Sequence, residues 1–103
     1  MELETAKKRL QSFLGDRELT FSIRTYPDGE WVAECNEIPA IMTGGKEDDI
    51  TSMDAMIRDA ILTAAGVDAE FAGEILKFVG YRQPNRLIKL SKTERTEADY
   101  VIA

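Results

Sequence analysis

The stretch that most constrains the fold is residues 41–66, IMTGGKEDDITSMDAMIRDAILTAAG. Its second part carries apolar side chains at steps of three and four residues, which places them on one face of a helix. Asp54, Arg58 and Thr63 fall off this stripe and can face water. The pattern therefore predicts an amphipathic helix whose buried stripe consists of Ile50, Met53, Ile57, Ala60, Ile61 and Ala64.

The ends of this helix are also marked in the sequence. Asp48 or Asp49 can cap its start, because a short carboxylate accepts hydrogen bonds from the free amides of the first turn. Gly66 suits the left-handed position that ends a helix. We therefore expect a helix over 49–65. A glycine pair separates it from a short apolar run at 41–43, which predicts a strand, a glycine turn and then the helix.

The residues before this unit predict a β-hairpin. Residues 19–26 alternate between apolar and polar side chains, which is the period of a half-buried strand. Pro-Asp-Gly at 27–29 is a turn sequence. Residues 30–36 form the expected return strand, with one face made by Trp31, Ala33 and Cys35. A connector with Pro39 leads from this strand to 41–43, which we expect to be a third strand of the same antiparallel sheet.

The flanking segments give further predictions. Residues 2–14 carry a helical apolar stripe. A third helix is expected to run from Asp68 to about Val79. Strand is predicted at 86–90, a polar loop at 91–97, and a last strand or a frayed end at 100–103.

Together these elements predict an α+β fold. Its core is a three-stranded antiparallel sheet with helices packed on one face. An extra N-terminal helix precedes the sheet, and a helix plus one or more strands follow it. A chain of 103 residues has the length of one domain, so residues 1–103 are interpreted as a single unit.

Composition excludes several classes of function. The formal net charge of −6 and the pI near 4.6 disfavour a chain whose whole surface binds nucleic acid or acidic membrane. The acidity suits a protein that meets a basic partner, although solubility alone explains it equally well. No apolar run approaches the roughly eighteen residues of a membrane span, and the first residues lack a signal-peptide pattern. A cytoplasmic protein is expected.

The residues needed for common catalytic chemistry are scarce. The chain has no histidine and a single cysteine, Cys35. An intramolecular disulfide is therefore impossible, and a zinc site is disfavoured. Cys35 lies in an apolar strand pattern, where a packed thiol is expected more than a nucleophile. We predict no catalytic residue, no cofactor and no bound metal.

Five segments follow one another within residues 21–61: the turn Asp28-Gly29, the strand Trp31-Val32-Ala33-Glu34-Cys35, the connector Glu37-Ile38-Pro39, the pair Gly44-Gly45 and the helical triplet Asp59-Ala60-Ile61. Their order resembles that of the HicB antitoxin family. The resemblance implies a partial ribonuclease-H-like fold without nuclease activity. It also implies a non-enzymatic antitoxin, or a solitary relative of one, that binds a small basic toxin-type protein.

On this hypothesis the contact surface is the open face of the sheet or an edge strand. The candidate partner-binding residues are Tyr26, Trp31, Glu34 and Glu37. For Trp31 the alternative is that it is the largest core residue. A homodimer is compatible with the same surface.

Two other functions stay open from the sequence. The first is a small metal-dependent hydrolase that uses acids near 34–49, namely Glu34, Glu37, Asp48 and Asp49. The second is an operon-type DNA-binding repressor that acts through the basic region 77–95. Its candidate nucleic-acid-binding residues are Lys77, Arg82, Arg86, Lys89 and Lys92, and pairing of this region with the protein's own acids is the alternative.

Overall fold

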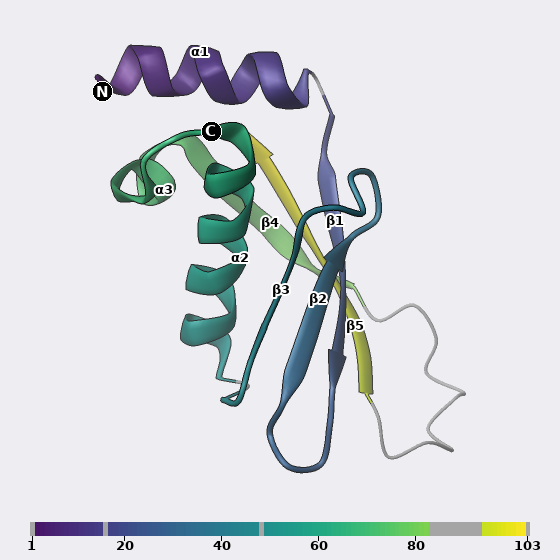
Figure 1. The fold of residues 1–103 in the computed structure, drawn as a ribbon. Coiled ribbons are helices and arrows are strands. Elements are labelled where there is room, and N and C mark those ends of the chain that lie inside the picture. The colour runs from purple at the N-terminus through teal and green to yellow at the C-terminus, as the bar shows by residue number, and fades with distance from the viewer. Residues whose placement is uncertain (1, 16, 48, 83–93, 103) are drawn as a thin grey trace.

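A computed structural model describes residues 2–15, 17–47, 49–82 and 94–102. The fold is α+β (Figure 1). Its elements are, in chain order, α1 (Leu3–Leu14), β1 (Leu19–Thr25), β2 (Trp31–Cys35), β3 (Met42–Gly45), α2 (Ile50–Ala65), a 3-10 turn η1 (Ala69–Phe71), α3 (Ala72–Ile75), β4 (Leu76–Arg82) and β5 (Glu94–Ile102).

The sheet has five strands in the order β3-β2-β1-β5-β4, and every pair is antiparallel. The predicted three-stranded sheet is therefore too small. β5 pairs with the whole length of β1, from Leu19 opposite Tyr100 to Thr25 opposite Glu94. This pairing places β1 at the centre of the sheet and leaves β3 and β4 as its two rims.

The helix that dominates the sequence pattern is confirmed as α2. Oδ2 of Asp49 accepts a hydrogen bond from the Ser52 backbone N–H at 3.0 Å, which caps the first turn. Gly66 ends the helix with a φ of 72°, a left-handed value that glycine adopts without strain. The buried stripe is Met53, Ile57, Ile61 and Leu62. Leu62 is buried and Ala64 is exposed, so the stripe is turned slightly from the predicted one.

One face of the sheet makes the core. Along β2 the side chains of Trp31, Ala33 and Cys35 are buried, whereas Val32 and Glu34 are exposed. The buried residues of β1 and β5 join the same apolar cluster, together with Ala6, Leu10 and Leu14 of α1 and the stripe of α2. The other face of β1, β2 and β3 is open to solvent at Arg24, Val32, Glu34 and Met42, whereas Thr20 at one end of it is buried.

The region after α2 differs from the prediction. The expected helix from Asp68 to Val79 is limited to η1 and α3, and the chain turns into β4 at Leu76. The reason is tertiary: Leu76 pairs with Ile102 and Phe78 with Tyr100, and the two aromatic rings lie 5.5 Å apart. A helix cannot satisfy this long-range ladder.

β5 also corrects the sequence interpretation. Residues 94–97, predicted as loop, are paired with β1, while 91–93 lie outside the described residues. The strand predicted at 86–90 also falls outside them. At the C-terminus the strand alternative holds, because β5 continues through Ile102.

Candidate functional site

The open sheet face carries a depression of about 330 Å³ over β1 and β2. The side chains that point to this face come from alternate positions of the two strands, and the neighbouring turn and connector complete the lining. The polar and apolar residues that line it include Ser22, Arg24, Tyr26, Val32, Glu34, Asn36 and Pro39. Two of the predicted partner-binding residues, Tyr26 and Glu34, thus lie in one surface feature.

The floor of the depression is held by a side-chain contact between β1 and the connector after β2. The Ser22 hydroxyl donates a hydrogen bond to Oδ1 of Asn36 at 2.8 Å. Ser22 lies opposite Glu34 in β2 and opposite Glu97 in β5, so carboxylates flank it on both neighbouring strands. The centre of the open face is therefore polar and acidic.

Glu37 has a different role from that expected. Its Oε1 accepts the backbone N–H of Thr20 at 2.6 Å and the thiol of Cys35 at 3.6 Å. Cys35 Sγ in turn accepts the N–H of Ile38 at 3.4 Å. Glu37 therefore fastens the connector to β1 rather than lining the depression. Burial raises the pKa of the Cys35 thiol, which keeps it protonated and unreactive.

Trp31 is a core residue. It is only 2% exposed, because the alternation of β2 places it on the same side as Ala33 and Cys35. Its indole N–H has no hydrogen-bond partner. Trp31 therefore belongs to the interior and not to the contact surface, which is the alternative that the sequence left open.

Two exposed apolar side chains lie at the depression: Val32 lines it, and Met42 is on the neighbouring strand β3. Val32 is 40% exposed and Met42 is 57% exposed. Met42 is opposite Glu34, and Val32 is opposite Gly44, so both side chains are on the open face at neighbouring positions of β2 and β3. Apolar and acidic groups thus alternate across this part of the sheet.

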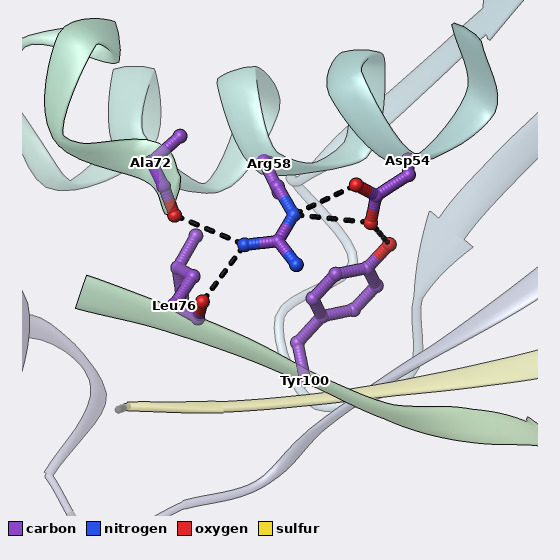
Figure 2. Close-up of polar contacts among 5 residues, drawn as sticks. All are labelled: Asp54, Arg58, Ala72, Leu76 and Tyr100. Atoms are coloured by element: carbon purple, nitrogen blue, oxygen red, sulfur yellow. Dashed lines mark hydrogen bonds and ion pairs between the residues drawn. The ribbon is translucent and has the colours of Figure 1, made fainter. Parts of the chain in front are cut away.

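A polar cluster on the core side, at Asp54, Arg58 and Tyr100, was missed by the sequence interpretation (Figure 2). Nε of Arg58 contacts both carboxylate oxygens of Asp54, at 3.0 and 2.9 Å. One terminal nitrogen of Arg58 donates to the carbonyls of Ala72 and Leu76. The Arg58 side chain is only 16% exposed. It is therefore largely buried, although the sequence pattern allowed it to face water.

We call this cluster the clamp, because Nε and one terminal nitrogen of Arg58 are directed at the chain's own carboxylate and carbonyls. Arg58 also lies over the ring of Tyr100, with 5.5 Å between Cζ and the ring centroid. The four-residue spacing of Asp54 and Arg58 was the only sequence signal for it.

The other candidate residues are placed only in part. Lys77 is exposed on β4, and Arg82 ends that strand. Arg86, Lys89 and Lys92 lie outside the described residues, as does Asp48. Within the described ranges, no three histidine, cysteine, aspartate or glutamate residues gather closely enough to hold a metal ion.

Comparison of the chain with known protein families, with curated proteins and with solved structures finds no match. Of the helices described, none has the length and apolar character needed to cross a membrane.

Proposed function

We propose that this chain is a non-enzymatic interaction module, a HicB-like antitoxin or a solitary relative of one. It binds a small basic toxin-type protein through the open face of β1 and β2. The observation that carries the proposal is the depression on this face, because Tyr26 and Glu34 line it together.

The chemistry of the surface supports a protein partner. Tyr26 is half-buried, and an aromatic ring with a polar end concentrates binding energy at interfaces. Val32 offers exposed apolar area next to it. A rigid sheet also presents these groups with little loss of conformational freedom on binding.

The charge distribution favours a basic partner. Glu34 and Glu97 flank Ser22 at the centre of the face, and the chain carries a net charge of −6. Complementary charge speeds the encounter and selects the partner. Arg24 lies on the same face and repels positive charge. A basic partner is therefore expected to dock with its positive side chains toward Glu34 and Glu97 and away from Arg24.

Co-expression with the product of the adjacent reading frame tests the proposal. We expect a small basic protein that co-purifies with this chain. Glu34→Lys should weaken the complex about tenfold or more, because it reverses a charge inside the contact surface. Glu70→Lys is the matched control, since Glu70 is exposed on η1, away from the open face.

Two results would count against the proposal. One is the absence of any complex with the wild-type chain. The other is an equal loss of binding in the two variants, which would indicate that only overall charge matters.

A further inference from the structure

The rim strand β3 has unused backbone hydrogen-bonding groups. The Cys35 N–H donates to the Ile41 carbonyl at 2.9 Å, which makes these two residues a hydrogen-bonded pair. In an antiparallel ladder such pairs alternate, so Thr43 and Gly45 also direct their amides and carbonyls toward β2. Met42 and Gly44 therefore direct theirs outward, and within the described part of the chain these groups have no protein partner.

The two rims of the sheet differ in how they are protected. β4 carries the exposed charge of Lys77 and a bulge between Phe78 and Gly80, both of which hinder pairing with another strand. β3 contains no charged residue, no proline and no bulge. It is therefore the rim that can accept a further strand.

We infer that β3 pairs with β3 of a second copy of this chain. Closed two-fold symmetry is the usual arrangement of homo-oligomers, and it requires a self-complementary surface. An antiparallel pair centred on Thr43 meets this requirement. Met42 of one copy then exchanges two hydrogen bonds with Gly44 of the other, and the symmetric pair forms as well. The outward groups of both strands are all used, and the two sheets become one.

The side chains on the open face fit the same register. Met42 is the most exposed large apolar residue described, and the pairing places it opposite a glycine, which leaves room for its side chain. Val32 lies beside Gly44 in the ladder and is itself exposed. Met42 of one copy therefore covers Val32 of the other, and this happens twice around the axis.

The occupant is a second copy because the β3 rim is complementary to itself. Met42 and Gly44 lie one residue to either side of Thr43. A two-fold axis at Thr43 therefore brings Met42 of each copy into contact with Gly44 of the other. The paired area is small, so the dimer dissociates on dilution. The dimer covers Val32, which also lines the depression over β1 and β2, so self-association and partner binding share this side chain.

Sedimentation velocity of the full chain over a concentration series tests the inference. We expect a monomer–dimer equilibrium. Met42→Lys should raise the dissociation constant at least tenfold, because it places a charge against the facing strand. Val79→Lys is the matched control, since Val79 is 52% exposed on the opposite rim strand. It should leave the dissociation constant unchanged.

A cross-linking variant fixes the register and serves also if Met42→Lys fails to fold. In Thr43→Cys the two new thiols face each other across the axis, within the Cα separation that a disulfide spans. Oxidation should give a disulfide-linked dimer. A wild-type chain that stays monomeric at all concentrations, dimers abolished by Val79→Lys, or Thr43→Cys that does not cross-link would each overturn the inference.

Discussion

The hydroxyl of Tyr100 donates a hydrogen bond of 2.7 Å to Oδ1 of Asp54, and this contact joins residues 46 positions apart. It ties the first half of α2 to β5, the strand that completes the sheet (Figure 2). Arg58 extends the tie to the corner between α3 and β4. These hydrogen bonds hold α2 against the core face of the sheet, and none of them involves the open face of β1 and β2.

Replacing Arg58 tests this clamp. Arg58→Met keeps the apolar stem but leaves the carbonyls of Ala72 and Leu76 without their donor. We expect the free energy of unfolding to fall by about 2 to 3 kcal/mol, since hydrogen bonds to a charged group in a part-buried site are lost. Urea denaturation measures the change.

The matched control for Arg58 is Arg9→Met. Arg9 donates one exposed hydrogen bond to the Gly66 carbonyl at 3.0 Å. Its replacement should cost about 0.5 kcal/mol or less, as exposed contacts do. Equal losses in the two variants would show that the clamp adds no stability beyond a surface contact.

Gly45 is required by the position of the Trp31 ring. A Cβ at Gly45 would lie 2.8 Å from the indole nitrogen and 3.3 Å from Cε2. Because the ring is buried, it has little room to move, and Gly45→Ala should cost about 1 to 3 kcal/mol. Gly73→Ala meets nothing within 4 Å in α3 and should be neutral or slightly stabilising. A thermal unfolding series that ranks the two variants in the reverse order would contradict this account of Trp31.

The cap of α2 makes stability depend on acidic pH. Hydrogen bonds from Ser52, first from its side chain and then from its backbone, hold the pKa of Asp49 below its ordinary value of 3.8. The contribution is therefore complete above pH 3.8 and is lost as the pH falls through the lower folded-state pKa. Asp49→Asn keeps an acceptor but does not titrate. As the pH falls through this range, the free energy of unfolding of Asp49→Asn should rise relative to that of the wild type. Parallel pH profiles of the two proteins would contradict the prediction.

The buried thiol has the opposite pH dependence. Burial raises the pKa of Cys35 above its ordinary value of 9.0, so the folded state retains a proton that the unfolded chain releases. Its contribution is complete below pH 9 and is lost as the pH rises through the folded-state pKa. The stability difference between wild type and Cys35→Ala should therefore narrow above pH 9.

A thiol reagent should label Cys35 only on unfolding, and rapid labelling of the native protein would refute its burial.

Local sequence patterns predicted each helix and strand in the first two-thirds of the chain, although Gly44 and Gly45, expected to form a turn, lie in β3. The three- and four-residue spacing around Met53, together with Asp49 and Gly66, defines α2 because each of these signals acts within a few residues. The alternation of Trp31, Ala33 and Cys35 likewise identifies the buried face of β2. Such signals need no knowledge of distant partners.

The remaining part depends on contacts that local patterns do not encode. The spacing of Ile75, Leu76 and Val79 fits a helix, yet pairing with β5 makes Leu76–Arg82 a strand. The polar residues 94–97 carry no strand pattern and are ordered by β1. The site shows the same limit: the sequence offered Tyr26 and Glu34 as separate candidates, and the depression that they share depends on strand register.

Hydrogen exchange of the free chain and of its complex with the co-expressed basic protein tests the central claim most directly. Backbone amides near the depression, in β1, β2 and the connector at Asn36, should gain protection on binding, while the outer surfaces of α1 and α2 should not change. Protection confined to α1 or α2, with β1 and β2 unaffected, would contradict the account.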